Sequence, residues 1–450
     1  MSKVEKAQQR PFYGWVIVAC AFLVIFLHMS IRGSFGVFLA PMGADMGWTT
    51  AQTSMGLSVF MVCYGIAAVF AGSNMDRFGP RPVFIMHGLL LGAGIFLSGY
   101  ARQPWHFYLS YGVAGGTGAG ALFAPPTAMV RKWFLRDLGR AMGIATAGTG
   151  LGFGLAPIVS MWLIRVLSWQ DAMRILGAIV GVGVVIVALF TKRDPESIGQ
   201  VPLGYEDAGG FDAAVADLAE TVGDVPAAED AVVAEMEDVD AADYSFSLAQ
   251  ALRTPAFWLC AGLWFCSNFA EFTVYSHSVN YATLDLGFDK TLATVLFSLI
   301  GFSFMVAGPI GGAFVDRLTA RMAGDGFAAR KRVLATFYGI SMVTAIALQF
   351  IRTPVAYGIY CVCYGAAYGT YIPAVAGYVG TVFGRKFMGR IWGVVTLIGM
   401  AGGAGIAPVF AGWLRDLTGN YALAIWCSVL MYAITVVLVL AVRKPKAPAA

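Results

Sequence analysis

Charged residues are scarce in this sequence of 450 residues. Asp, Glu, Lys and Arg make up 12% of it, whereas apolar residues make up 58%. Soluble domains usually carry about 25% charged residues, so an ordinary soluble composition is excluded. The apolar residues instead gather in repeated runs of about 20, a length that spans a hydrocarbon core of about 30 Å. We therefore predict a membrane protein embedded in a lipid bilayer.

Several kinds of chemical motif are also missing from the sequence. No Gly-Lys-Ser/Thr follows the glycine clusters at 148–154 and 399–405, which argues against an ATP-driven pump with a P-loop. The seven cysteines all lie in apolar runs and are interpreted as small buried side chains. Catalytic Ser/His/Asp or Cys/His sets and metal-ligand clusters are absent from these runs. We expect no enzyme activity, no cofactor, no metal and no nucleic-acid partner.

The apolar runs predict twelve transmembrane helices, which place both chain ends on one side. Of the 30 Lys and Arg residues, 23 fall in the termini and in the loops on that same side. The positive-inside rule then places both termini in the cytoplasm, and we expect the inner membrane of a bacterium. The expected spans are 13–40, 52–74, 82–101, 105–130, 138–166, 169–191, 255–283, 291–315, 333–351, 354–383, 390–414 and 421–442.

An acidic segment separates two groups of six spans. Residues 194–252 contain no Lys or Arg, and 13 of the 26 acidic residues lie between Glu206 and Asp243. Such a composition cannot bury much surface and is typical of a mobile tether; a regulatory or partner-binding role is the alternative. The predicted domains are an N-terminal six-helix bundle at 1–191, an acidic cytoplasmic linker at 192–252 and a C-terminal six-helix bundle at 253–450.

The two halves repeat each other along the sequence. Asp76-Arg77 after the second span matches Asp316-Arg317 after the eighth, 240 residues later. Ala156-Pro157 in the fifth span matches Ala407-Pro408 in the eleventh, 251 residues later. A parallel repeat of six spans is a recognised design of secondary transporters, with the substrate site near the midplane between the halves. The predicted fold is therefore an all-α membrane protein of two pseudo-symmetric six-helix bundles.

The loop after the second span holds a candidate conformational latch. Asp76, Arg77 and Arg81 flank a Gly-Pro turn and can bridge the cytoplasmic ends of neighbouring helices. Asp316 and Arg317 form the second copy. Such a latch would be paired in one conformation and exposed in another, which suits a rocking transporter. Charge that only sets the topology is the alternative.

Two charged residues lie deep inside the expected spans, Arg32 in the first and Glu271 in the seventh. A charge at the bilayer centre costs about 2.5–3.5 kcal/mol on insertion scales, so it should face a partner or a wet cavity. Adding the repeat offset of 240 to Arg32 gives position 272, so the two residues lie at nearly equal depth. We expect them to be close together, or bridged by substrate or water. A permanent salt bridge between the halves is the alternative.

Polar and aromatic side chains extend this pair into a candidate substrate site. His28 lies one turn before Arg32 on the same helical face. Tyrosine offers an apolar wall with a polar tip, which suits a small amphiphilic anion; helix packing is the alternative for the tyrosines. His277 projects away from this face and is left out. The expected substrate-binding residues are Arg32, His28, Asn268, Tyr275, Tyr364 and Tyr368, with Glu271 as the proton-coupling residue.

Seven short motifs lie at the starts of spans and in the loops between them. They are Tyr13–Ile17, Asp76–Arg81, Lys132–Phe134, Gly139–Gly148, Arg253–Trp258, Val279–Ala282 and Asp285–Phe288. Together they resemble the major facilitator superfamily, and within it the branch of monocarboxylate transporters and oxalate/formate antiporters. The resemblance covers nearly the whole chain outside the linker and implies transport of small carboxylates by alternating access.

Three charged positions found in that branch are occupied differently here. Its members usually carry a substrate-binding arginine in the eighth span, often with an aspartate one turn earlier. Gly308 stands at the first of these positions and Phe304 at the second. The antiporters also carry a lysine in the eleventh span, whereas Trp392–Gly405 contains no charge. The usual anion anchors of that branch are therefore absent from this chain.

The residues and the resemblance together predict a secondary active transporter of a small, monocarboxylate-like organic anion, proton-coupled and monomeric. Arg32 would bind the carboxylate, since a guanidinium binds planar anions well. With Arg32 occupied, Glu271 would take up a proton, and substrate and proton would travel together. Two alternatives remain: a transporter of a neutral or cationic solute with Glu271 as its ligand and Arg32 as its gate, or a non-transporting membrane sensor.

Overall fold

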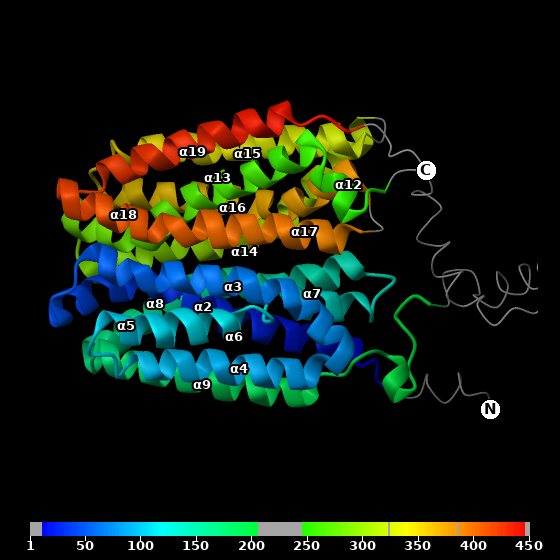
Figure 1. Cartoon of the computed structure of the whole chain (residues 1–450), viewed down its shortest axis with the longest axis horizontal. Helices are drawn as coiled ribbons and strands as arrows, with labels where there is room; N and C mark the ends of the chain where they lie inside the picture. Colours follow the sequence, from blue (N-terminus) through cyan, green and yellow to red (C-terminus); the bar gives the residue numbers. More distant parts are fainter. Residues whose placement is uncertain (1–10, 206–244, 323–324, 385–386, 446–450) are drawn as a thin grey trace, which may run out of the picture.

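The structure is a computed structural model that describes residues 11–205, 245–322, 325–384 and 387–445. Over these residues the chain is almost wholly helical, with a single isolated β-bridge between Phe134 and Leu203. The long helices run side by side along the long axis of the molecule (Figure 1). The predicted all-α membrane fold is confirmed.

The first half of the chain supplies six spans, one of them interrupted. They are α2 (Gly14–Met46), α3 (Thr50–Phe78), α4 (Pro80–Ser98), the series α5 (Pro104–Phe107), η1 (Tyr108–Gly115), α6 (Gly116–Ala119) and α7 (Ala124–Arg131), then α8 (Leu138–Val166) and α9 (Trp169–Phe190).

The second half supplies the other six spans after two short helices. The short helices are η2 (Glu196–Ile198) and α12 (Leu248–Leu252). The spans are α13 (Pro255–Asn280) with η3 (Tyr281–Asp285), α14 (Lys290–Arg321), α15 (Gly326–Leu348), α16 (Pro354–Phe383), the series α17 (Met388–Leu397), η4 (Ile398–Ala404) and α18 (Gly405–Thr418), and α19 (Ala422–Ala441). Among the described residues, nine of these twelve spans are long and apolar enough to cross a membrane. The three that are not among these nine are the interrupted fourth span, α13 and α16.

The fourth span differs from the continuous helix expected at 105–130. Its helix becomes a π-helix at η1, breaks between Ala119 and Ala124, and resumes with Pro125 and Pro126 in the first turn of α7. Proline has no backbone N–H and disfavours helical backbone in the residue before it, so the helix cannot run continuously through this pair.

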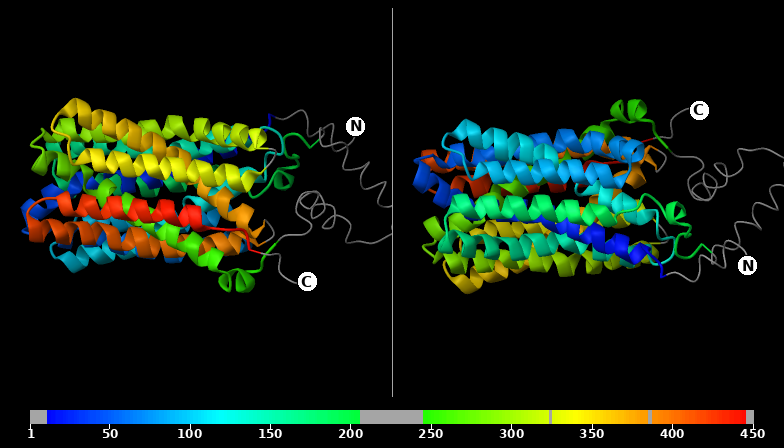
Figure 2. Two further views of the ribbon diagram at one scale, coloured as in Figure 1. Left: turned by 90° about the horizontal axis from the view of Figure 1, so that it is seen from above. Right: turned by 90° about the horizontal axis from the view of Figure 1, so that it is seen from below.

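The helices form two groups that lie one above the other in Figure 1. The C-terminal group is in front in the left view of Figure 2, and the N-terminal group is in front in the right view. Within the first group α2 packs on α8, and α4 on α9; within the second α13 packs on α19, and α14 on α16. The groups meet where α8 packs on α14 and α3 on α18, with α13 against α2 between them. Glycines make this approach close: a Cβ on Gly301 would lie 2.1 Å from the backbone nitrogen of Gly154.

Only the beginning and the end of the predicted linker lie among the described residues. Leu203 is held against the loop after α7, because its N–H donates to the carbonyl of Trp133 at 2.9 Å and its carbonyl accepts from the N–H of Arg136 at 2.8 Å. Residues 206–244, including the acidic run, lie outside the described residues. The first part of the linker is therefore attached to the N-terminal group.

The long helices run between two opposite ends of the molecule. α2 begins and α19 ends at the same end (Figure 1), which we call the terminal end. The opposite end, where α3 and α14 begin, is the distal end.

Candidate functional site

Arg32 is a buried cation in the middle of α2, only 5% exposed. The carbon of its guanidinium group lies 5.2 Å from the ring centre of Phe272, 5.5 Å from that of Tyr64 and 6.0 Å from that of Phe153. Among the described residues no carboxylate lies within ion-pair distance of it, and its Nε has no hydrogen-bond partner. A desolvated cation–π contact contributes about 2 kcal/mol, so aromatic faces stabilise this charge in place of an anion.

Glu271 lies on α13 and is 2% exposed. The hydroxyl of Tyr371 donates to its Oε2 at 3.4 Å, and the hydroxyl of Tyr368 also interacts with this carboxylate. Arg32 is close enough for the two charges to attract each other, but the pair forms no direct salt bridge. The structure therefore does not contain the permanent salt bridge that we considered as an alternative.

The rings around Arg32 continue into a larger cluster. Phe153 also packs against Tyr275, at 5.1 Å between ring centres, and against Tyr368, at 6.4 Å. Tyr368 in turn lies 5.0 Å from Phe304. We call this cluster, which comes from α3, α8, α13, α14 and α16, the aromatic cage; it consists of Tyr64, Phe153, Phe272, Tyr275, Phe304 and Tyr368. It lies between the two groups of helices and contains side chains from both.

The structure brings some of the predicted site residues to the cage and directs others elsewhere. His28 stacks on Tyr64 at 5.7 Å, and neither of its ring nitrogens has a partner. Tyr364 instead exchanges a hydrogen bond of 3.0 Å with the hydroxyl of Tyr432, inside the C-terminal group. Asn268 donates to the carbonyl of Trp264 on its own helix at 2.7 Å. Arg32, His28, Tyr275 and Tyr368 thus share one region, whereas the side chain of Tyr364 lies in the core of its bundle.

The predicted latch residues lie at the terminal end. Arg81 donates to the carbonyl of Leu189 at 2.8 Å, which ties the start of α4 to the end of α9, and Asp76 accepts from Arg193 through its carbonyl at 2.9 Å. Arg77 lies over the ring of Phe78. Arg317 is exposed, and the Asp316 side chain lies outside the described part. These contacts stay within the N-terminal group, and the latch role remains a prediction.

Contacts that the sequence did not indicate join the two groups of helices at the distal end. The carboxylate of Asp416, near the end of α18, accepts from the N–H groups of Thr50 and Ala51 at 3.0 and 2.8 Å. It thereby caps the first turn of α3 across the interface. Further along, Ser58 accepts from the N–H of Val409 at 3.1 Å. A carboxylate at a helix N-terminus is favourable because the free N–H groups carry partial positive charge.

A second distal contact occupies the corresponding place in the other half of the repeat. Arg165, near the end of α8, lies 3.8 Å from Asp289, which precedes α14. Subtracting 251 from Asp416 gives 165, and subtracting 240 from Asp289 gives 49, the residue that caps α3. The backbone N–H of Leu292, followed by the side chain of Thr291, holds the pKa of Asp289 below its usual range. Both distal contacts therefore join the end of one helix to the start of its neighbour in the other half.

His277 belongs to this distal interface and not to the cage. Its Nε2 lies 2.9 Å from the carbonyl of Pro408 and 3.5 Å from the hydroxyl of Ser54 in the other half, and its Nδ1 lies 3.2 Å from the hydroxyl of Tyr421. At the terminal end, by contrast, a Cβ on Gly143 or Gly393 would meet nothing within 4 Å. Within the described residues, the polar contacts between the two halves lie toward the distal end.

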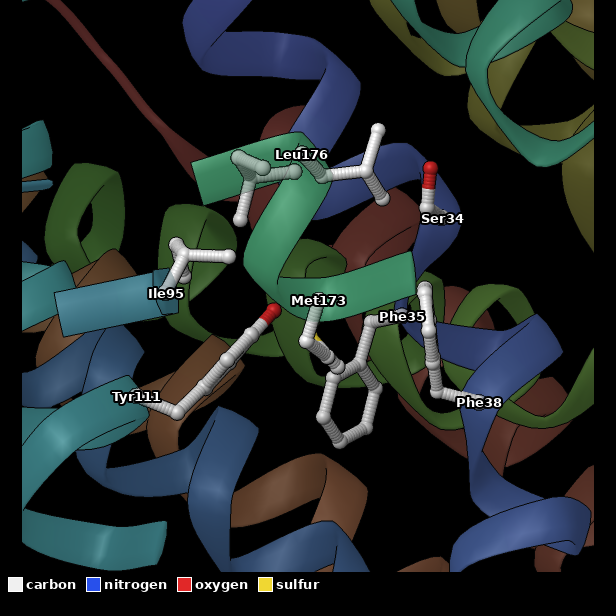
Figure 3. A pocket seen from close by; sticks show the side chains of 8 residues that line it. Ser34, Phe35, Phe38, Ile95, Tyr111, Met173 and Leu176 are labelled. Atoms are coloured by element: carbon white, nitrogen blue, oxygen red, sulfur yellow. The ribbon is translucent and has the colours of Figure 1, made fainter. Parts of the chain in front are cut away.

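A small cavity lies among the helices of the N-terminal group (Figure 3). Its volume is about 10 Å³, room for about one water molecule. The hydroxyl of Tyr111 points into it and has no partner. The cavity is lined by Ile31, Ser34, Phe35, Phe38, Ile95, Tyr111, Met173 and Leu176. All of these residues come from the N-terminal half, so this cavity is distinct from the cage.

The two repeated helix groups, with a buried charged site between them, are the architecture of a secondary transporter. Residues 21–405 match the family model described as Major Facilitator Superfamily, so the chain belongs to this superfamily. The predicted family is thus confirmed, and the protein is a multi-pass membrane transporter.

Two relatives of this chain are named as monocarboxylate transporters. The chain is 26% identical to "Monocarboxylate transporter 13" of Bos taurus, over 91% of this chain and 84% of that protein. It is also 26% identical to "Monocarboxylate transporter 12" of Rattus norvegicus, over 92% and 82%. Among solved structures, a bacterial homologue of the human lysosomal transporter Spinster, in an inward-facing and occupied conformation, matches with a TM-score of 0.65, 15% identity and 96% of each chain covered. This last likeness shows the fold.

Proposed function

We propose that this transporter carries a small organic anion by alternating access, with Arg32 as the anchor of the substrate carboxylate. The observation that carries the proposal is a guanidinium that is buried between the two halves, without a carboxylate partner and with its Nε unpartnered. A buried charge normally has a counter-charge, because desolvation costs several kcal/mol. An anionic substrate supplies that charge while it is bound. The relatives named as monocarboxylate transporters support the same class.

Proton coupling through Glu271 is the second part of the proposal. Glu271 is buried in the same region as Arg32, whose positive charge favours a nearby ionised carboxylate. A substrate carboxylate on Arg32 screens this attraction and adds a like charge nearby, so Glu271 binds a proton more readily. Linkage makes the effect reciprocal, and protonation of Glu271 tightens substrate binding. We place the protein in a bacterial inner membrane with both termini in the cytoplasm, in keeping with its basic terminal-side loops.

The anion anchor is tested by carboxylate binding to Arg32→Gln. Hydrogen bonds to charged groups contribute about 1.5–3 kcal/mol, so we expect affinity to fall about 10- to 100-fold. Arg174→Gln is the matched control, since Arg174 pairs with Asp171 at the distal end. Unchanged affinity in Arg32→Gln would remove the anion site. A thermal-shift screen in which amines or sugars, and not carboxylates, stabilise the protein would favour a cationic or neutral solute instead.

The proton carrier is tested in proteoliposomes with Glu271→Gln. This variant is expected to lose accumulation driven by a pH gradient but to retain exchange of labelled for unlabelled substrate, because exchange needs no net proton movement. Full gradient-driven accumulation would show that Glu271 is not the carrier. Absence of any solute flux in the wild-type protein would favour a sensor over a transporter.

A further inference from the structure

We propose that the transported anion is an aryl monocarboxylate, with one carboxylate attached to an aromatic ring and no second charged group. This inference rests on the proposed function and assigns the class of its substrate. It follows from two properties of the region around Arg32: a single cation, and walls made almost entirely of aromatic rings.

The single cation limits the substrate to one carboxylate. Arg165, Arg174 and Arg415 lie at the ends of their helices, which leaves Arg32 as the cation at the depth of the cage among the residues that the structure describes. A second substrate carboxylate would be buried without a counter-charge and close to Glu271. Breaking or omitting one partner of a buried charge pair is strongly unfavourable. Dicarboxylates are therefore excluded by the charge at the site.

The walls of the cage offer few hydrogen-bonding groups. Phe153, Phe272 and Phe304 have none, and the hydroxyl of Tyr368 is engaged with Glu271. The remaining polar atoms are the hydroxyls of Tyr64 and Tyr275 and the ring nitrogens of His28, which stacks on Tyr64. The Tyr275 ring packs on Phe153, which faces Arg32, and the buried hydroxyl of Tyr275 has no hydrogen-bond partner. We assign it as a second donor to the substrate carboxylate. A sugar or polyhydroxy acid would leave its hydroxyls unpaired against these rings, which binding sites strongly reject.

The arrangement of the rings favours an aromatic ligand over an aliphatic one. Aromatic pairs prefer offset or edge-to-face contacts with centres about 4.5–7 Å apart. The cage is already built this way: Phe304 meets Tyr368 at 5.0 Å and 63°, and Phe153 at 6.3 Å and 71°. A ligand ring in the cage forms contacts of the same kind with rings from both halves. Phe153 already packs against Tyr275 and Phe304, so the ligand ring enters as these rings move apart, with its carboxylate at Arg32.

The test is binding of a matched series of acids to the full-length purified protein in nanodiscs. Benzoate is the aryl probe, cyclohexanecarboxylate matches its size without the aromatic ring, phthalate adds a second carboxylate, lactate is the small hydroxy acid, and benzamide removes the charge. We expect benzoate to bind about 3- to 10-fold more tightly than cyclohexanecarboxylate, from one or two favourable ring contacts. Phthalate, lactate and benzamide should bind at least 10-fold more weakly than benzoate.

A pair of variants tests whether the cage causes the preference. Phe153→Leu should reduce the ratio of benzoate to cyclohexanecarboxylate affinity toward one, whereas the matched control Phe38→Leu, on α2 away from the cage, should leave it unchanged. Phe304→Leu serves as a second cage variant if Phe153→Leu does not fold. An unchanged ratio in a folded cage variant would overturn the role of the cage.

The failures of the two proposals are distinguishable in the same series. If lactate or phthalate binds as tightly as benzoate, the aryl monocarboxylate inference is wrong, while the anion site at Arg32 stands. If none of the acids binds, or if benzamide binds as well as benzoate, the anion site itself is wrong.

Discussion

The distal contact made by Asp416 should control how often the distal end opens. Its carboxylate accepts two backbone hydrogen bonds from α3 in the other half, and it is exposed to solvent. Loss of a helix N-cap costs about 0.5–2 kcal/mol, and solvent exposure keeps the value within that range. Asp416→Ala removes both acceptors and should cost about 1–2 kcal/mol of distal closure, a change of about 5- to 30-fold in the open population. Asp416→Asn keeps one neutral acceptor and should lie between wild type and Asp416→Ala.

The assay is a distance distribution between spin labels placed on the two halves at the distal end. Gln103 and Asn420 are exposed there on opposite halves, and the seven native cysteines are first replaced. The matched control is Asp171→Asn, because Asp171 accepts from Ser168 and Arg174 within its own half. We expect a longer-distance population to grow in Asp416→Ala and not in Asp171→Asn. An unchanged distribution in Asp416→Ala, or equal changes in both variants, would refute the reasoning.

Three further predictions concern the same interface. Gly301→Ala should abolish transport, because its Cβ would overlap the backbone of α8, whereas Gly308→Ala should keep it, because the nearest atom is 3.7 Å from that Cβ. His277→Ala leaves the Pro408 carbonyl and the Tyr421 hydroxyl without this partner, so it should lower the melting temperature in detergent, by a loss of about 1–3 kcal/mol. The lowered pKa of Asp289 keeps its carboxylate charged, so its contribution is present above the usual aspartate pKa of about 3.9 and is lost only below it. Distal spin-label distances in the wild-type protein should therefore stay the same between pH 7.5 and pH 5.5. The prediction is wrong if these distances lengthen over that range in the wild-type protein and not in Asp289→Asn.

The repeat in the sequence carried most of the information about the fold and the location of the site. The offset of 240 residues placed Arg32 and Glu271 at one depth, and the structure has both buried and close enough to attract each other. It did not indicate how Arg32 is stabilised. A charge in a span signals a partner, but ring faces can take that place as well as a carboxylate can, and periodicity does not distinguish the two.

Of the aromatic cage, Tyr275 and Tyr368 were among the predicted site residues, whereas the other four rings were missed, although one signal for them was present. Adding 240 to Tyr64 gives 304, so Tyr64 and Phe304 are repeat mates, as Arg32 and the Glu271 region are. Phe153 lies among glycines that we interpreted only as sites of helix contact; those same glycines let α14 approach and bring Phe304 to within 6.3 Å of it. The distal contact of Asp416 could not have been predicted from side-chain pairing, because its partners are backbone N–H groups.

The distal contacts and the contacts of a ligand in the cage have similar energies, so a small ligand can shift the equilibrium between the open and closed conformations of the distal end. The Arg165–Asp289 pair is exposed, so solvent screens it strongly, and the Asp416 cap contributes about 1–2 kcal/mol. A ligand can shift a conformational equilibrium only by the difference between its affinities for the two states. Because the cage draws its rings from both halves, that difference is largest where the halves close on the ligand. One carboxylate on Arg32 contributes about 1.5–3 kcal/mol, enough to offset distal contacts of this size and too little to lock the protein in one state.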